Sequence, residues 1–387
     1  MGALNGVRIV EFGGIGPGPF SAMMLAEMGA EVLRLDRVQP SDLGIARETR
    51  FDITQRSRPS VALDLQTSAG REAALRLIEQ ADALIEGYRP GVMERLGLGP
   101  DICLSRNPAL VYGRMTGWGQ TGPLAQSVGH DLNYLALSGI LSKIGPEEKP
   151  AIPLSLIGDY GGGAMFLSLG VVAALFDARE SGRGQVVDAA MVDGITTLFS
   201  SGFGSKASGE LVDRRESNSV DGGAPWYGVY ETKDGRFITI APIERKFYRN
   251  LLELLGLGLS LLDSQFDRSQ WPALRQRFEE IFRTKTRTEW EAIMEGHEIC
   301  FAPVLTLEEA MHHPHMTARG RYAEIGGIRQ PVPAPNFSRT PSEIRMPPRP
   351  AGADSEVALA NWGFSRSEIA RLIEEGVVVS AGQQADG

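Results

Sequence analysis

Residues 7–37 read VRIVEFGGIGPGPFSAMMLAEMGAEVLRLDR, and their pattern indicates the fold class of the N-terminal domain. The run Val7–Phe12 is apolar and β-branched, as in a buried strand, and Gly13–Pro19 is a glycine and proline turn. Phe20–Met28 then has helical spacing and ends at a glycine, and Glu31–Leu35 returns as a second strand. The order strand, turn, helix, strand predicts a parallel pair and an α/β domain.

The same alternation continues along the chain. A helix is predicted around Gly70–Gln80 and a strongly apolar one over Ala164–Asp177, and GRGQVVD (182–188) turns into another strand. We therefore expect a Rossmann-like large domain built on a parallel sheet. The other strands predicted for this sheet are Val61–Leu65, Ala83–Glu86 and Ala109–Arg114.

The sequence changes character after about residue 200, where Ser200–Ser208 and Asp213–Gly223 are polar, small and loop-like. Trp226–Tyr230 and Phe237–Ala241 flank a Lys-Asp-Gly-Arg turn and predict a β-hairpin. This part of the chain predicts a smaller α+β domain. Its expected helices are Glu244–Leu255, Trp271–Arg283 and Thr288–Met294.

The C-terminal part is expected to return to the large domain. Residues 320–351 are proline-rich and are predicted to be irregular, and Ser365 with Glu368 forms a capping box at a helix start. The predicted division of the chain is 1–195 for the first part of the large domain, 196–223 for a linker, 224–306 for the small domain and 307–387 for the return segment.

The composition is that of a soluble globular protein, with 22% charged and 42% hydrophobic residues. A net charge of −9 argues against nucleic acid and anionic membranes as partners. Cys103 and Cys300 cannot form a disulfide framework and stand in no metal-binding spacing, so a reducing compartment is expected. The first residues show no secretory signal, and the expected location is cytoplasmic.

The glycines of the first turn are close to a dinucleotide-binding fingerprint, because Gly14–Gly18 follows a strand and Asp36 ends the next one. The third glycine position of that fingerprint is Pro19, which has no N–H and does not allow close helix–strand packing. Asp36 is flanked by Arg34 and Arg37, which suit a phosphate better than a ribose hydroxyl. We therefore interpret the glycines as a tight βα turn and not as a nicotinamide or flavin site.

Five arginines lie within a short part of this otherwise acidic chain. Guanidinium groups bind phosphates bidentately and keep their charge at any working pH, so such a group could hold a nucleotide with several phosphates. The alternative is a solvated loop face, which is the interpretation that the sequence alone favours. The five residues are Arg37, Arg47, Arg50, Arg56 and Arg58.

The segment GHDLNY (129–134) places His130 between a glycine and Asp131. Imidazole titrates near neutrality, so His130 could accept or donate a proton; the alternative is a buried histidine with satisfied hydrogen bonds. The run His-His-Pro-His at 312–315 resembles a metal tract at first, but its proline breaks the common helical face. We expect a helix end on the surface there, and we predict no metal site.

Asp159 stands in GDYGGG (158–163), directly before the predicted apolar helix. An aspartate in this place is commonest as an N-cap. Three consecutive glycines also let a ligand approach the backbone and aim N–H groups at a negative oxygen, so the carboxylate could be a nucleophile or a base that faces an enolate. Glu244 follows the second hairpin strand, and by itself it is interpreted as a surface or capping carboxylate.

Motifs along nearly the whole chain resemble those of CoA-transferase family III, the CaiB/BaiF group, and within it those of the α-methylacyl-CoA racemases. Each motif alone is weak, and their number and order make the resemblance specific for the family. It implies that the two-domain chain forms an interlocked homodimer. The motifs are GIGPGPF (14–20), EVLRLDR (31–37), VALDLQ (61–66), EGYRPGVMERLGLGP (86–100), RMTGWGQTGP (114–123), GHDLNYLALSGIL (129–141), GDYGGG (158–163), GRGQVVDAAMVDG (182–194), DGGAPWYGVYETKDG (221–235), APIERKFY (241–248) and APVLTLEEA (302–310).

The resemblance implies an enzyme that moves a proton between the two faces of the carbon beside a thioester. His130 and Asp159 match the two bases, and Glu244 matches a carboxylate that pairs with the histidine across the dimer interface. Gly161 and Gly162 are expected to donate N–H groups to the thioester oxygen. The acyl-CoA is the substrate, and no separate cofactor is expected. The residues that match the CoA and substrate site are Arg37, Leu63, Asp64, Leu65, Gln66, Gly87, Tyr88, Arg95, Gly129, Asp131, Leu132, Asn133 and Tyr134.

Gln66 departs from the family pattern, which usually has lysine there, and this removes one cation near the CoA that nearby arginines could replace. Two other functions are open. In CoA transfer between carboxylic acids, Asp159 forms a mixed anhydride and no imidazole at position 130 is needed. A non-catalytic acyl-CoA binding protein explains the arginines but not a histidine, an aspartate and a glutamate in matching places. Branched fatty, sterol-derived and aryl-propionyl chains all agree with the resemblance.

Overall fold

The chain folds into two compact units in the computed structural model, which describes residues 2–39, 42 and 44–380. The second unit includes residues 139–153 and 307–318, which the sequence analysis assigned to the large domain. The first unit is Met1–Ser138, Leu154–Leu198 and Arg319–Gly387, and the second is Gly139–Pro153 and Phe199–Ala318.

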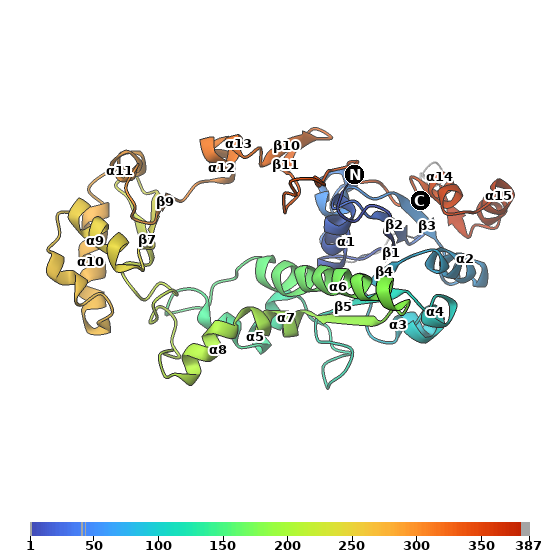
Figure 1. Cartoon of the computed structure of the whole chain (residues 1–387), viewed down its shortest axis with the longest axis horizontal. Helices are drawn as coiled ribbons and strands as arrows, with labels where there is room; N and C mark the ends of the chain where they lie inside the picture. The colour runs from blue at the N-terminus through green and yellow to red at the C-terminus, as the bar shows by residue number, and fades with distance from the viewer. Residues whose placement is uncertain (1, 40–41, 43, 381–387) are drawn as a thin grey trace. The chain divides into compact units, whose positions relative to one another are not determined.

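A seven-stranded sheet forms the centre of the first unit, with the order β12-β3-β2-β1-β4-β5-β6. Figure 1 labels β1 to β5 of this sheet. All its pairings are parallel except that of β12, which is antiparallel to β3. The order 3-2-1-4-5-6 is that of a doubly wound fold and confirms the predicted Rossmann-like domain. The strands are β1 (Arg8–Phe12), β2 (Glu31–Asp36), β3 (Ser60–Leu63), β4 (Ala83–Glu86), β5 (Val111–Thr116), β6 (Val186–Ala190) and β12 (Val378–Val379).

Helices cover both faces of this sheet, as buried parallel strands require. Alternate strand side chains, such as Val10 and Leu33, pack into one core with residues of α2, α3, α14 and α15. The other face is covered by α1, which contacts β2 and β4, and by α6, which contacts β5 and β6. The helices of this unit are α1 (Pro17–Glu27), α2 (Ser68–Glu79), α3 (Val92–Arg95), α4 (Pro100–Arg106), α5 (Asp131–Leu137), α6 (Met165–Ser181), α7 (Met191–Leu198), α14 (Ser355–Asn361) and α15 (Arg366–Glu374), with the 3-10 turns η1 (Thr49–Phe51) and η2 (Ile53–Gln55).

Two of the five arginines that the sequence placed on a loop face or around phosphates are buried in ion pairs. Arg58 Nε lies 2.9 Å from Glu11 Oε2, and Arg56 Nε lies 2.5 Å from Glu27 Oε1. All four side chains are buried, and we call them the ion-pair cluster. Both interpretations were wrong for these two arginines, because their partners lie far away in sequence, on β1 and α1.

The segment with the three glycines does not form a loop before α6. Leu156–Ala164 is a π-helix, η4, that continues directly into α6, so the helix begins earlier than the predicted Ala164. The combined helix Leu156–Ser181 has 26 residues and is long and apolar enough to cross a membrane, and 50% of its most apolar window is buried. A core helix meets the same criteria, and α6 packs against β5 and α1.

The second unit contains a three-stranded antiparallel sheet with the order β7-β8-β9. Its first two strands form the predicted hairpin, and aromatic residues such as Trp226 and Phe278 pack in one core beside it. Ser200–Ala207 is helix α8, where a loop was predicted, because its serines and glycines are weak helix formers. The other elements are η3 (Ile140–Lys143), β7 (Gly228–Glu231), β8 (Phe237–Ile240), α9 (Arg245–Leu254), η5 (Leu259–Leu262), η6 (Arg268–Gln270), α10 (Trp271–Phe282), α11 (Arg287–Met294), β9 (Phe301–Pro303), α12 (Leu307–His312) and α13 (Pro314–Ala318).

The C-terminal part of the first unit contains a hairpin inside the proline-rich stretch that was predicted to be irregular. Strands β10 (Tyr322–Ile325) and β11 (Ile328–Pro331) are antiparallel, and both glycines between them have positive φ, as a tight two-residue hairpin turn requires. The predicted capping box is confirmed at the start of α15, where Ser365 accepts the N–H of Glu368.

Candidate active site

The residues predicted to bind CoA follow several neighbouring strands at one edge of the first unit's sheet. Arg37 comes directly after β2, Leu63–Gln66 end β3 and lead into α2, and Gly87–Tyr88 come directly after β4. Because these strands are parallel, their carboxyl ends share one edge, which is where doubly wound folds bind ligands. The loop after β5 leads to His130 from the same edge.

A cation and an aromatic ring meet at this edge. The guanidinium carbon of Arg37 lies 5.7 Å from the centre of the Tyr88 ring, and the Tyr88 N–H donates to Glu86 Oε2 at 2.7 Å. Glu86 is buried and paired with Arg114 at 2.9 Å, and burial raises the pKa of Glu86 to about 7. Arg37 is exposed. It belongs to the five arginines noted in the sequence, and it lies next to Tyr88, which was predicted to bind CoA.

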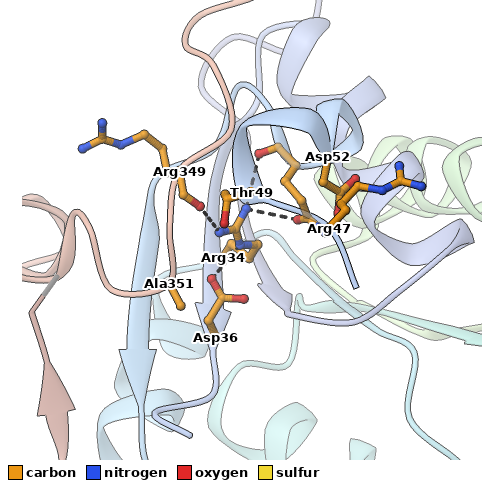
Figure 2. Close-up of a pocket in the computed structure, with 8 residues that line it drawn as sticks. Arg34, Asp36, Arg47, Thr49, Asp52, Arg349 and Ala351 are labelled. Carbon is orange, nitrogen blue, oxygen red and sulfur yellow. Dashed lines mark hydrogen bonds and ion pairs between the residues drawn. The ribbon is translucent and has the colours of Figure 1, made fainter. Parts of the chain in front are cut away.

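A pocket of about 210 Å³ opens beside the end of β2. Figure 2 shows the Arg34 guanidinium in its middle, with bonds to Asp36 at 2.7 Å and to the Arg349 carbonyl at 2.7 Å. The side chains of Arg47 and Arg349 extend away from it (Figure 2). Arg34 is therefore already bonded to protein groups. Asp36 accepts hydrogen bonds from Arg34 and from the Ser60 hydroxyl, the latter at 2.5 Å. The pocket is lined by Arg34, Asp36, Arg47, Thr49, Asp52, Gln55, Arg349 and Ala351.

His130 is the N-cap residue of α5 and is exposed, so the buried interpretation of this histidine was wrong. Its N–H donates to the Asn133 side chain at 3.0 Å, and its carbonyl accepts the Asn133 N–H at 2.8 Å. The backbone at position 130 is therefore held, while the imidazole is open to solvent. Leu132, on the same turn, is exposed as well.

Tyr134 holds the chain that precedes His130. Its hydroxyl donates to the Gly129 carbonyl, and its ring meets Trp118 edge-on at 4.7 Å between ring centres. A Cβ at Gly117 would lie 2.0 Å from the Tyr134 ring, and a Cβ at Gly129 would lie 2.8 Å from it. The glycines at these two positions thus make room for the ring, and Tyr134 acts on the backbone of the site.

Asp159 lies in η4 and is partly buried. Its N–H donates to Asp131 Oδ1 at 2.7 Å, so the structure brings together η4 and the helix that His130 caps. Burial raises the pKa of Asp159 to about 6; the charge of Asp131 raises it further, and the charge of His130 and a hydrogen bond from Ser155 lower it. The carboxyl therefore titrates close to the range of imidazole groups.

Gly16 lies against the Asp159 carboxylate, a contact that the sequence analysis missed. Gly16 is the N-cap of α1 with φ +68°, and a Cβ there would lie 3.4 Å from Asp159 Oδ2. Helix α1 begins at Pro17, earlier than the predicted Phe20, because proline is well suited to a first helical position. The turn before α1 thus leaves room for the Asp159 carboxylate. Beside it, the ring of Tyr160 packs on that of Phe20 at 4.5 Å between ring centres.

Gly161 and Gly162 are not at a helix N-terminus, as was predicted, but inside η4. In a π-helix the amides bond to carbonyls five residues earlier, so these N–H groups belong to the helix ladder. The glycines instead allow close packing: a Cβ at Gly162 would lie 2.8 Å from Ile195, and one at Gly194 would lie 1.9 Å from the Gly162 carbonyl. The expectation of free glycine donors came from the wrong helix boundary.

The other predicted residues lie at helix ends. Arg95 ends α3 and is exposed, and Glu244 is the exposed N-cap residue of α9 in the second unit. His312 ends α12 and is exposed. Within the described parts of the chain, no group of three or more His, Cys, Asp or Glu side chains could hold a metal ion.

Comparison with known proteins shows the family of this chain. The sequence profile of CoA-transferase family III matches residues 4–355 of this chain. The chain is 43% identical to the α-methylacyl-CoA racemase of Mus musculus, over 97% of this chain and 98% of that protein. It is 41% identical to the α-methylacyl-CoA racemase of Homo sapiens, over 98% of each chain. A crystal structure of a CAIB/BAIF family protein from Brucella suis has the same fold, with a TM-score of 0.79 and 24% identity over 93% of this chain and 99% of that one.

Proposed function

Because this chain belongs to CoA-transferase family III, we propose that it is an α-methylacyl-CoA racemase that interconverts (2R)- and (2S)-2-methylacyl-CoA thioesters. The observation that carries the proposal is the link between His130 and Asp159 through Asp131. It brings together an imidazole and a carboxyl group, and burial raises the pKa of that carboxyl to about 6.

The proposed reaction needs two positioned groups because a thioester acidifies its α-hydrogen only partly. In one direction the Asp159 carboxylate removes the α-proton, the electron pair moves to the thioester oxygen as an enolate, and the His130 imidazolium protonates the carbon from the other face. In the opposite direction neutral His130 removes the proton and protonated Asp159 returns one. A carboxyl with a pKa of about 6 can serve in both states near neutrality, whereas an ordinary aspartate is almost always ionised there.

We infer that the enolate oxygen takes its hydrogen bonds from the first turn of α5 rather than from Gly161 and Gly162. The amides of Asp131 and Leu132 stand next to His130, and among the described residues they have no protein acceptor. Free first-turn amides are suited to a developing negative charge. None of these proton transfers requires a metal, a nicotinamide or a flavin.

The proposed substrate carries its CoA along the carboxyl edge of β2, β3 and β4. Arg37 is exposed and stands beside Tyr88, so it can meet a phosphate or an adenine ring. Gln66 is exposed in the turn after β3, where its neutral amide can hydrogen-bond but supplies no charge. Lys at this position is therefore expected to tighten CoA binding more at low salt than at high salt.

We propose that the working form is a homodimer in which Glu244 of the partner subunit pairs with His130. An apolar stripe on α6 supports a partner: Met165, Leu169 and Phe176 are 47%, 67% and 70% exposed and recur at helical spacing. Light scattering should give a dimer, and Leu169→Asp with Phe176→Asp should give monomers without epimerisation activity. A fully active monomer would contradict the shared site.

The experiment that tests the function is incubation with one epimer of a 2-methylacyl-CoA in D2O, followed by mass spectrometry and chiral analysis. A racemase incorporates α-deuterium and forms the other epimer without any acceptor acid. A CoA-transferase needs the acceptor and forms an Asp159 adduct that hydroxylamine traps. A binding protein does neither, and either of these two outcomes rejects the proposal.

A further inference from the structure

Asp131 was predicted to touch the substrate, but its side chain is turned into the protein. It is 8% exposed, and its carboxylate accepts the N–H of Asp159 at 2.7 Å and the N–H of Gly158. Asp131 is also the first residue of α5, directly after His130. One side chain therefore connects the backbone of one candidate base to the helix that carries the other.

Gly158 shows how close this connection is. A Cβ on Gly158 would lie 2.1 Å from Asp131 Oδ1, which is far inside van der Waals contact. Only glycine therefore lets the carboxylate reach the two amides of η4. The arrangement depends on the identity of both residues, and they lie on different elements, α5 and η4.

The partners of Asp131 explain why a buried carboxylate is stable here. Among the residues that the structure describes, Asp131 makes no ion pair with Arg or Lys. Two backbone N–H groups in the first half of η4 replace the lost water, and a negative charge is favourable near the start of a helix. The carboxylate thus behaves as a cap of η4 that is supplied by α5.

On the basis of the proposed function, we propose that Asp131 is a positioning residue that holds Asp159 beside His130 through the amides of η4. It does not touch the reacting carbon. Its loss is expected to leave substrate binding nearly intact and to misplace one of the two groups that transfer the proton.

The charge of Asp131 has a second effect on Asp159. The titratable groups that interact electrostatically with Asp159 are Asp131, His130, Tyr134 and Tyr160. After burial, Asp131 contributes most to raising the pKa of Asp159. Replacing Asp131 by a neutral residue therefore lowers the pKa of Asp159.

The test compares Asp131→Ala, Asp131→Asn and the control Asp101→Ala, which removes an exposed aspartate from the first turn of α4. In Asp131→Ala, kcat for α-deuterium incorporation should fall about 100-fold, with KM for the acyl-CoA within about threefold. Asp131→Asn keeps an acceptor for the amides, so its kcat should stay within about tenfold of the parent. For the direction in which Asp159 removes the α-proton, the pH profile of kcat in Asp131→Asn should have its acid limb at lower pH than in the parent, because the pKa of Asp159 falls.

A second readout does not depend on activity. Amide hydrogen exchange of a peptide that covers residues 156–160 should be faster in Asp131→Ala than in the parent and in Asp101→Ala. A parent-like kcat in Asp131→Ala, or a loss that lies in KM alone, overturns the positioning role. If the unmodified enzyme exchanges no α-hydrogen, the proposed function fails, and amide exchange that is unchanged in Asp131→Ala then overturns the positioning role by itself.

Discussion

The buried carboxylates of the first unit fall into two groups with different neighbours. In the ion-pair cluster, Glu11 and Glu27 each face an arginine, at 2.9 Å and 2.5 Å. Asp131 and Asp159 have backbone amides, a serine and a histidine as neighbours, and no ion pair with Arg or Lys within the described residues. Both groups lie in the first unit, and under the proposed function only Asp159 exchanges protons with a substrate.

The causes of the pKa shifts differ between the two groups. Burial raises the pKa of Glu11 and of Asp159, because both carboxylates lose water. For Glu11 the strongest neighbour is Arg58, which opposes the rise, whereas for Asp159 it is Asp131, which adds to it. Arg58 favours the charged form of Glu11, but burial outweighs this effect and raises the pKa of Glu11 to about 7. At Asp159 the charge of Asp131 adds to burial, and the pKa rises to about 6. Glu11 is fully buried beside Arg58, whereas Asp159 is only partly buried.

The largest expected effect is on catalysis. His130→Ala and Asp159→Ala should each lower kcat for α-proton exchange by about 10²- to 10⁴-fold, because each removes one proton-transfer group. CoA affinity, measured by calorimetry, should survive in both variants. The control Asp263→Ala removes an exposed carboxylate and should be as active as the parent. Full racemase activity in either site variant would refute the two-base assignment.

The next largest effect concerns the ion-pair cluster and is on stability. Arg58→Met leaves Glu11 buried without its cation and should lower the free energy of unfolding by about 3–5 kcal/mol. The double variant Glu11→Gln with Arg58→Met should recover part of this loss, because no unpaired charge is left. Denaturant unfolding measures both. A parent-like midpoint for Arg58→Met would mean that the comparison between the two groups is wrong.

A smaller effect of opposite sign is expected at Asp159. Its pKa is about 6 in the folded protein and 3.8 as its ordinary value, so ionisation is less favourable in the fold and stability falls as pH rises between these values. Asp159→Asn removes that charge and should raise Tm at pH 7.5 by about 1–3 °C. Below about pH 4 the carboxyl is protonated in both states, and the difference should vanish. A Tm that is lower at pH 7.5 would contradict this sign.

The smallest effect is expected for an arginine outside both groups. Arg50 is exposed and pairs with Glu48 at 2.9 Å, and such surface pairs contribute about 0–1 kcal/mol. Arg50→Met should therefore leave both the unfolding midpoint and kcat near the parent values. It is the matched control for Arg58→Met, since the same substitution is made in the same run of arginines. If Arg50→Met and Arg58→Met lowered the free energy of unfolding equally, the distinction between exposed and buried arginines in this segment would be wrong.

Local sequence was sufficient for the strands, the parallel sheet and the capping box at Ser365, because these follow from short-range periodicity and capping chemistry. It also singled out His130 and Asp159 as candidates, since their residue types and glycine-rich surroundings are unusual within a few positions. It was misleading for the glycines at 161 and 162, because a π-helix has no simple signature in a glycine-rich segment.

The tertiary structure decided which charged groups are neutralised and which are not. Arg56 and Arg58 look like Arg50 in sequence, and only the folded chain shows that they face Glu27 and Glu11 from another element. The role of Asp131 depends in the same way on the amides of η4, which come close only when α5 packs on that helix. The sequence by itself thus determined the sheet and indicated His130 and Asp159 as candidate bases. Long-range packing alone decided the raised pKa of Asp159 and the contact between η4 and α5, because both depend on burial and on neighbours that are distant along the chain.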